Sequence, residues 1–282
     1  AGTYYSGSLV TLTAAPQAGY RVGRWTGTAD DWSKANTNFV VMLQDRDVTV
    51  GFEQPRVIVV GSEPNYTSVQ RGIDEAEDGD IVVVPTGNWD PPYPGYPAPE
   101  ITITIDKGIT LTSSNPDDPC SVAATVFDNV IFVISTIDTE ATIDGLTITN
   151  SRMNINFSSP TIRNCVFREN NWFGMDGDPV PGGDGENGVS VNGGAMTMYN
   201  SSPIVQNCLF IDNSVTGGDG AVGDTKPWPA GDGGWAGWAY GGAVYIGYGS
   251  NPIFTNCSFV NCFARGGNGG DGGNDNVSPL IH

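Results

Sequence analysis

The sequence predicts an all-β solenoid, a parallel β-helix, with one capping helix at its start and a small β-rich module before it. Three observations predict this fold. A thirteen-residue pattern recurs three times in the second half of the chain. Glycine is abundant, with 39 residues, whereas only 15% of the residues are charged. One amphipathic stretch, residues 65–79, leads directly into a run of apolar residues.

The first 53 residues alternate apolar and polar side chains over short runs, as β-strands do. The runs are 8–14, 39–43 and 48–52, and glycines and a polar stretch separate them. We expect Tyr20 and Trp25 to supply much of the small core. Gln54-Pro55 then marks a boundary, so we assign residues 1–53 to one module and 56–282 to the solenoid.

The first module resembles a known family. YYSGSLVTLTAAPQAGYRVGRWTGT, followed later by VTVGFE, is similar to the bacterial InlB B-type repeat. The resemblance implies a β-grasp-like spacer or adhesive module on a surface protein, without catalytic activity. The usual first strand of the family is missing, so we expect this copy to be truncated at its N-terminal side.

Residues 65–79, NYTSVQRGIDEAEDG, predict the capping helix. Thr67 or Ser68 can cap its N-terminus, and an apolar face recurs at Val69, Ile73 and Ala76. Gly79 follows where a glycine commonly ends a helix. The apolar run 80–85 comes next, so we expect the helix to cover the open end of a stack of strands.

The repeated pattern predicts consecutive coils. It reads SSPTIRNCVFREN at 158–170, SSPIVQNCLFIDN at 201–213 and SNPIFTNCSFVNC at 250–262, with a looser copy at 141–150. Ile162 and Cys165 have opposite parity, although both are expected to point inward, so the chain must bend between Asn164 and Cys165. Stacked coils would then align three asparagines and three cysteines in two internal columns: Asn164, Asn207 and Asn256, and Cys165, Cys208 and Cys257.

The cysteine column has two interpretations. Stacked coils bring sulfur atoms close together, but parallel neighbours in register rarely reach disulfide geometry. We therefore favour small buried apolar side chains over disulfides.

The repeats also resemble known families. NGGAMTM with CLFIDN, and YGGAVYI with CSFVNC, are similar to the GGA-[IVL] and FxxN motifs of polymorphic outer-membrane-protein repeats, with Cys262 where FxxN has asparagine. SVQRGIDEAEDGDIVVVPTGNW, followed by ITIDKGITLTSSNPDDP, resembles the opening of pectin-lyase-like β-helices in bacterial surface proteins. The resemblance implies a right-handed parallel β-helix on a secreted or surface-attached bacterial protein.

Long glycine- and aspartate-rich inserts at about 171–192, 216–240 and 264–276 separate the later coils. All leave the coil at the same corner, so we expect one lobe on one side of the solenoid. Aspartates in these inserts are candidate calcium ligands, and solvated turns without a metal are the alternative. The candidates are Asp176, Asp178, Asp184, Asp219, Asp224, Asp232 and Asp271.

Four tryptophans lie in or beside the inserts: Trp172, Trp228, Trp235 and Trp238. Exposed rings could stack on sugars or anchor a partner. We favour the alternative that they pack the inserts onto the solenoid, because long glycine-rich loops need an apolar anchor to be ordered.

Charge and composition exclude some functions and favour others. The net charge of −19, with 12 Lys+Arg against 31 Asp+Glu, offers no basic surface for nucleic acid. No apolar run approaches the length of a membrane span. A polysaccharide lyase would need a basic residue beside calcium, but Lys107 and Lys226 lie in no repeated acidic cluster, so we name no catalytic residue.

The leading hypothesis is therefore an extracellular or cell-surface bacterial protein with a structural or adhesive role. The solenoid would form a rigid stalk and the lobe a contact surface for glycans, a cell surface or further copies of the chain. A polysaccharide lyase or hydrolase of the pectin-lyase-like fold, or a carbohydrate-binding module, remains an alternative.

Overall fold

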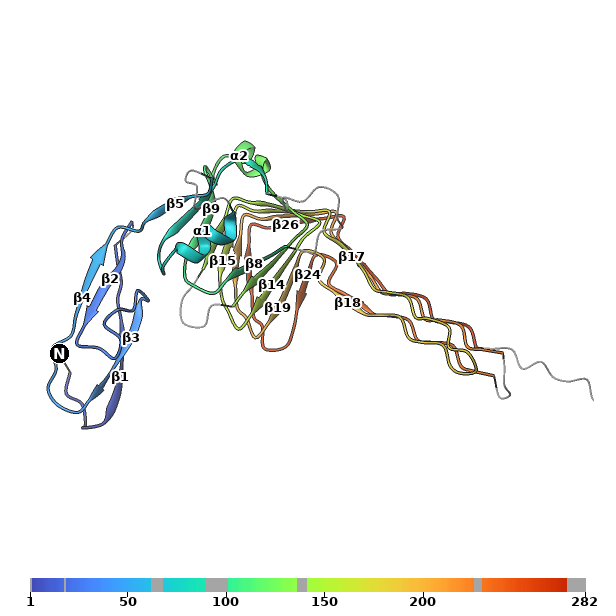
Figure 1. Cartoon of the computed structure of the whole chain (residues 1–282), viewed down its shortest axis with the longest axis horizontal. Helices are drawn as coiled ribbons and strands as arrows, with labels where there is room; N and C mark the ends of the chain where they lie inside the picture. Colours follow the sequence, from blue (N-terminus) through green and yellow to red (C-terminus); the bar gives the residue numbers. More distant parts are fainter. Residues whose placement is uncertain are drawn as a thin grey trace, which may run out of the picture.

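The computed structural model describes residues 2–17, 19–61, 68–89, 101–135, 141–225 and 230–272. It contains a small module, a solenoid of stacked coils, and a long lobe that projects from one side of the solenoid (Figure 1). The module lies at one end of the long axis and the lobe at the other. Among the described residues, no helix is both long and apolar enough to cross a membrane.

The N-terminal module consists of two antiparallel strand pairs. β1 (Ser8–Thr13) pairs with β3 (Thr37–Met42), and β2 (Arg21–Thr26) pairs with β4 (Thr49–Glu53). Trp25 is buried in the core and its Nε1 donates to the Ala35 carbonyl at 3.1 Å. The expectation for Tyr20 was wrong: it lies just before β2 and is 46% exposed.

Three parallel sheets form the described part of the solenoid. The first contains β5 (Val57–Val59), β6 (Ile81–Val84), β9 (Thr110–Ser113), β12 (Thr142–Asp144), β15 (Thr161–Arg163), β20 (Ile204–Gln206) and β25 (Ile253–Thr255). The second contains β7 (Gly87–Asn88), β10 (Thr125–Asp128), β13 (Thr147–Thr149), β16 (Val166–Arg168), β21 (Leu209–Ile211) and β26 (Ser258–Val260). The third contains β8 (Ile101–Ile105), β11 (Val130–Ile134), β14 (Arg152–Asn156), β19 (Met196–Tyr199) and β24 (Val244–Ile246).

The register confirms that the repeated pattern occupies equivalent places on consecutive coils. Thr161 pairs with Ile204, which pairs with Ile253 on the next coil. In the second sheet the inward phenylalanines stack, with ring centroids 4.8 Å apart for Phe167 and Phe210 and 4.6 Å for Phe210 and Phe259. Identical side chains at identical positions therefore build a continuous apolar column.

The capping helix is present but shorter than predicted. α1 (Val69–Glu75) begins after Ser68, whose hydroxyl accepts from the Arg71 N–H, and it buries Val69 and Ile73. Its C-cap is Ala76, so Gly79 does not end the helix as predicted. Instead Gly79 adopts a φ of +83° in a turn, where an added Cβ would lie 2.7 Å from the Arg21 Cβ.

A second helix, α2 (Pro119–Ala124), was not predicted. Asp118 caps it by accepting from the Cys120 N–H, and proline occupies its first turn. Asp-Pro before a short apolar run is a known helix-start signal, so the sequence did contain a basis for predicting α2.

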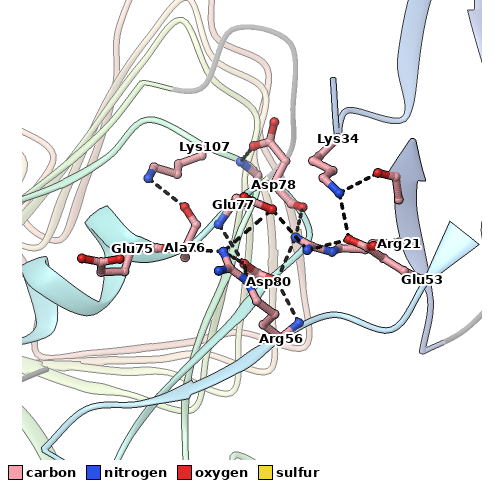
Figure 2. Close-up of polar contacts among 12 residues, drawn as sticks. Arg21, Lys34, Glu53, Arg56, Glu75, Ala76, Glu77, Asp78, Asp80 and Lys107 are labelled. Atoms are coloured by element: carbon pink, nitrogen blue, oxygen red, sulfur yellow. Dashed lines mark hydrogen bonds and ion pairs between the residues drawn. The ribbon is translucent and has the colours of Figure 1, made fainter. Parts of the chain in front are cut away.

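A buried ion pair links the module to the start of the solenoid (Figure 2). The Arg21 side chain is 6% exposed and its Nη1 lies 2.8 Å from Oδ1 of Asp80, which is fully buried. Arg56 Nη2 lies 2.7 Å from the other carboxylate oxygen, and the N–H groups of Arg56 and Glu77 also donate to Asp80. Burial would raise the pKa of Asp80, but these hydrogen bonds and the Arg21 charge outweigh it and lower the pKa.

The lobe leaves the solenoid between the second and third sheets, as predicted from the inserts. β17 (Asn171–Phe173), β22 (Ser214–Thr216) and β27 (Phe263–Arg265) begin the three outward passages and pair in parallel. β18 (Val191–Asn192) and β23 (Ala239–Tyr240) end the two inward passages. Figure 1 shows these passages stacked beside one another along the whole lobe.

Candidate functional site

The asparagine column is aligned as predicted, but it lies outside the core. Asn207 Nδ2 donates to Asn164 Oδ1 at 3.3 Å, and Asn256 Nδ2 donates to Asn207 Oδ1 at 2.8 Å. All three have φ values of +52° to +54°, so the predicted bend is present. Asn164 is half-buried while Asn207 and Asn256 are exposed, so the prediction of an internal ladder was wrong. The left-handed conformation turns these side chains outward at the corner.

A different pair of asparagines forms the buried ladder. Asn170 and Asn213 are fully buried, and Asn170 Nδ2 donates to Asn213 Oδ1 at 2.7 Å. Asn213 Nδ2 in turn contacts the sulfur of Cys262 at 3.7 Å. These are the FxxN positions, at the corner where the lobe leaves the solenoid. Their amides satisfy buried backbone groups such as the Phe167 carbonyl, at 2.9 Å.

The cysteine column consists of free thiols. Cys165 and Cys208 are buried, while Cys257 on the last described coil is partly exposed. The Cys208 thiol hydrogen-bonds within the column, and its contact with Cys165, followed by burial, raises its pKa. Burial also raises the pKa of Cys257. Protonated, unreactive thiols agree with a packing role.

The lobe is an ordered bundle of extended segments. Three outward segments (171–180, 214–224 and 263–272) alternate with two return segments (183–192 and 231–240). Hydrogen bonds recur at every third residue: the N–H groups of Gly217, Gly220 and Gly223 donate to carbonyls of Arg265, Asn268 and Asp271 at 2.8–2.9 Å. A three-residue period is that of polyproline II, so the interpretation of these runs as solvated turns was wrong.

Close packing of backbones explains the glycines of the lobe. A Cβ added at Gly220 would lie 2.1 Å from the Gly234 carbonyl oxygen, and one at Gly188 would lie 2.0 Å from that of Gly218. Neither residue has a positive φ. Glycine is therefore required here because another backbone approaches, as at the axis of collagen.

Carboxylates of the lobe accept hydrogen bonds from neighbouring backbones. Asp176 Oδ1 accepts from the Asp219 N–H at 2.8 Å, and Asp219 Oδ1 accepts from the Asn268 N–H at 2.6 Å. The Asn268 N–H, followed by its side-chain amide, lowers the pKa of Asp219. Asp184 accepts in the same way from the Asp232 N–H, and Asp224 from the Gly182 N–H.

The calcium prediction gains no support from this arrangement. Within the described ranges, no group of three or more His, Cys, Asp or Glu side chains could hold a metal ion. Asp178 and Asp271 contribute backbone carbonyls to the bundle, as acceptors from Glu186 and Gly223. Calcium binding at these aspartates stays a prediction. Four of the carboxylates, those of Asp176, Asp184, Asp219 and Asp224, accept hydrogen bonds from backbone N–H groups instead.

The tryptophans divide into two groups. Trp172 is half-buried: its Nε1 donates to the Gly194 carbonyl at 2.9 Å, and Arg152 lies over its ring at 4.2 Å. Trp235 is 74% exposed and Trp238 is 59% exposed, so the interpretation that these two pack the inserts down was wrong. Trp228 lies outside the described residues.

A pocket of about 410 Å³ opens where the lobe joins the outer face of the third sheet. β14 and β19 supply one wall and the ends of β17 and β18 the other. Thr197 Oγ1 donates to Asn154 Oδ1 at 2.7 Å. Asn192 Oδ1 is buried and has no hydrogen-bond partner among the described residues. The polar and aromatic side chains that line the pocket include Arg152, Asn154, Trp172, Asn192, Thr197 and Tyr199. No local pattern in the sequence indicated the pocket, because its walls come from segments about twenty to forty residues apart.

Aromatic rings continue from the pocket onto the lobe. Ring centroids lie 5.6 Å apart for Tyr199 and Tyr245, 6.2 Å for Tyr245 and Tyr240, and 5.8 Å for Tyr240 and Trp238. Most of these rings are partly exposed. The root of the lobe therefore combines aromatic faces with amides, hydroxyls and one guanidinium.

Comparison with protein families agrees with this architecture. The model described as a right-handed beta helix region matches residues 106–278. The chain belongs to the right-handed β-helix family. The divergent InlB B-repeat domain matches residues 1–56, which are the antiparallel module. Searches of curated proteins and of solved structures gave no match.

The two family matches also bear on cellular location. InlB B-repeats and right-handed β-helices are typical of bacterial surface proteins. Because the β-helix fold hosts proteins of several activities, the match establishes the fold and leaves the activity to be argued from the lobe and the pocket.

Proposed function

We propose that this chain acts in bacterial surface adhesion, with the solenoid as a rigid stalk and the lobe as the contact surface. The carrying observation is the lobe itself, an ordered bundle that projects far from the coils (Figure 1). A flexible loop would lose much conformational entropy on binding, whereas this bundle is already held by regular hydrogen bonds.

Exposed apolar side chains on the lobe support this role. Phe173 is 73% exposed, Met175 74% and Val222 52%, in addition to Trp235 and Trp238. Large apolar side chains gathered on one exposed element commonly mark a surface that meets a partner. The solenoid beneath has fully buried Phe and Ile columns, which suit a stiff support.

A lobe-deleted variant tests the proposal. An earlier coil passes from β13 to β14 through residues 150–151 alone. Deleting 171–194 and 214–242 leaves residues 169–170 and 212–213 as the links, so it copies a connection that the fold already uses. We expect the labelled intact chain to bind bacterial or host cell surfaces and the deleted variant to retain its β circular dichroism but lose binding. Equal binding by both proteins would exclude the lobe as the contact surface.

A double variant, Phe173→Ser with Met175→Ser, tests the same proposal in case the deletion variant does not fold. Both side chains are mostly exposed, so the fold should be unaffected while surface binding falls. Because Thr216 is half-buried in the same bundle, Thr216→Ser serves as a conservative control that should bind like the intact chain.

A second function, saccharide binding, is favoured by the pocket at the root of the lobe. Aromatic faces such as Tyr199 and Trp172 stack on sugar rings, and amides such as Asn154 and Asn192 bind hydroxyl groups. The buried, unpartnered Asn192 Oδ1 is an acceptor that a sugar hydroxyl could satisfy.

Glycan-array binding tests this second function. We expect the intact chain to bind a subset of oligosaccharides, and Asn192→Ala and Tyr199→Ala to weaken that binding at least tenfold. An exposed residue far from the pocket, Trp32, provides the control variant Trp32→Ala. Depolymerisation of pectate or alginate by the purified chain would instead support the lyase or hydrolase alternative.

A further inference from the structure

The pocket at the root of the lobe holds two carboxamide side chains on opposite walls. Asn154 belongs to β14 of the solenoid, and Asn192 ends β18 on the first return segment of the lobe. Each amide is already engaged at one end by a different neighbour. The end that has no protein partner therefore decides which group of a ligand each amide can bind.

Asn154 offers a hydrogen-bond donor to a ligand. Thr197 pairs with it in register on the next coil, and the Thr197 hydroxyl donates to Asn154 Oδ1 at 2.7 Å. Thr197 is only 7% exposed, so little water competes for this contact and the orientation of the amide is fixed. Because Oδ1 is engaged, the group that remains for a ligand is Nδ2, which has no acceptor among the described residues.

Asn192 offers a hydrogen-bond acceptor. Its Nδ2 donates to the Tyr199 hydroxyl at 3.4 Å, which leaves Oδ1 for a ligand. This oxygen is buried and has no donor among the described residues. A buried acceptor without a donor is unfavourable, so a ligand that supplies an N–H or O–H group at this point gains affinity.

The spacing of the two amides suits one small polar group between them. Thr197 and Tyr199, which hold the two amides, lie on the same face of β19, about 7 Å apart along the strand. The bridging group must accept from Asn154 and donate to Asn192. A hydroxyl would have to reach both amides from one oxygen, whereas an amide reaches them from its oxygen and its nitrogen.

We propose that this pocket binds an N-acetylated amino sugar through its acetamido group. The acetamido carbonyl accepts from Asn154 Nδ2, and the acetamido N–H donates to Asn192 Oδ1. The inference rests on the saccharide-binding function proposed above and names the class of sugar. Unlike a hydroxyl, an acetamido group also carries a methyl group, which matches the apolar side chains of Phe173 and Val191 in the pocket lining.

The aromatic wall of the pocket is held in place before any ligand binds. Trp172 Nε1 donates to the Gly194 carbonyl at 2.9 Å, and the Arg152 guanidinium lies 4.2 Å from the centre of its ring. Two contacts on one side chain restrict its rotamers. Binding therefore costs little side-chain entropy on this wall, which favours recognition of one defined sugar substituent.

Three trisaccharides that differ in one substituent test the inference. The β-1,4-linked trimers of N-acetylglucosamine, glucosamine and glucose carry an acetamido, an ammonium and a hydroxyl group at C2. By isothermal titration calorimetry, we expect the first trimer to bind the intact chain at least tenfold more tightly than the other two. The net charge of −19 attracts the cationic trimer, so its weaker binding would not come from long-range electrostatics.

Two variants connect this preference to the amides. Asn192→Ala removes the acceptor, so affinity for the acetylated trimer should fall to that for the glucose trimer. Thr197→Val keeps the shape of the side chain but removes the hydroxyl that orients Asn154, so the ratio of the two affinities should fall. A purely structural effect would weaken both trimers alike. Trp32→Ala, at an exposed residue outside the pocket, should keep the wild-type ratio.

The outcomes separate this inference from saccharide binding itself. Equal affinity for the acetylated and glucose trimers, or a preference that both variants retain, would overturn the acetamido assignment and leave saccharide binding intact. The same holds if none of the trimers binds while other glycans on the array do. No binding of any glycan would remove both proposals. An N-acetylated dipeptide that binds as tightly as the acetylated trimer would assign the pocket to peptides and also overturn the inference.

Discussion

The solenoid and the lobe are neighbouring parts of one repeat, yet they are stabilised in different ways. The solenoid buries columns of large apolar side chains such as Phe167, Phe210 and Ile148, each fully buried. The lobe buries almost none, and its segments are joined by backbone hydrogen bonds and by side chains that accept from a neighbouring backbone. Burial of apolar area dominates in the first region and hydrogen bonding with close backbone contact in the second.

The comparison shows two uses of repetition. In the solenoid, equivalent positions repeat large side chains because a column of rings fills the interior. In the lobe, equivalent positions repeat glycine because two backbones meet there. A single added methyl group is therefore harmless on most solenoid surfaces but disruptive inside the lobe.

Removing a core ring should have the largest effect. Phe210→Ala removes a fully buried side chain stacked between two others, so we expect the free energy of unfolding to fall by about 3–5 kcal/mol. Urea titration followed by circular dichroism measures this change. Phe259→Ala, at the same position on the last described coil but 50% exposed, should cost clearly less. Equal losses of unfolding free energy in the two variants would mean that the burial of each ring does not determine its contribution.

Disrupting the ion pair between the N-terminal module and the capping helix should have the second-largest effect on stability. Asp80→Asn removes the fully buried anion from Arg21, which then keeps only the partly exposed carboxylates of Glu53 and Glu77. We therefore expect the free energy of unfolding to fall by about 1.5–3 kcal/mol, with the effect confined to the module and cap. Hydrogen exchange resolves which segments lose protection. Lost protection in the lobe would contradict a local role.

The same junction predicts a dependence on pH. The pKa of Asp80 is lowered in the folded chain, so its stabilising contribution is complete above the ordinary carboxyl pKa. The contribution should disappear as the pH falls through the lowered value. Melting temperatures of the wild type and Asp80→Asn should therefore converge in acid, and a constant difference from neutral to strongly acidic pH would contradict this assignment.

Two glycine substitutions compare a position in the lobe where another backbone approaches closely with an equivalent position where none of the described backbones does. Gly220→Ala places a Cβ 2.1 Å from a carbonyl oxygen, and overpacking of this kind costs about 1–3 kcal/mol. Gly269→Ala, at the equivalent position one segment later, meets no described atom closer than 3.9 Å and should be nearly neutral. Amide exchange across 214–224 measures the effect, and similar exchange in the two variants would refute the close-approach explanation.

The smallest effect on stability is expected when a single side-chain hydrogen-bond acceptor of the lobe is removed. Asp219→Ala removes the partner of the Asn268 N–H, so exchange at that amide should accelerate while the solenoid amides keep their protection. Asp219→Asn retains an acceptor oxygen and should restore most of the protection. Added calcium should leave amide exchange of the wild type unchanged, whereas calcium-dependent protection that is lost in Asp219→Ala would support the metal-site prediction.

Much of the solenoid was predictable because its signals are local and repeated. The bend at Asn164 followed from the parity of Ile162 and Cys165, and coil equivalence followed from the recurring pattern. The direction of Asn164 was not predictable, since parity locates a bend without saying which side of it faces solvent. The buried ladder of Asn170 and Asn213 was missed because the Asn-Cys pair recurs in all three copies, whereas the third copy has Cys262 at the ladder position.

The lobe was predicted as a location but not as a structure. Glycine at every third residue, as at Gly217, Gly220 and Gly223, was present in the sequence and could have suggested polyproline II. Which backbone each glycine faces, and that Asp176 and Asp219 accept from neighbouring N–H groups, depends on pairing between segments more than forty residues apart.

By itself, the sequence determined the parallel β-helix, its capping helix, the presence of a small β-rich module and the corner from which the inserts leave. These follow from periodicity, which each residue and its near neighbours carry. Tertiary structure alone decided the bundle of the lobe and the pocket at its root. Such features arise where backbones distant in sequence meet, and no local pattern records which two segments will touch.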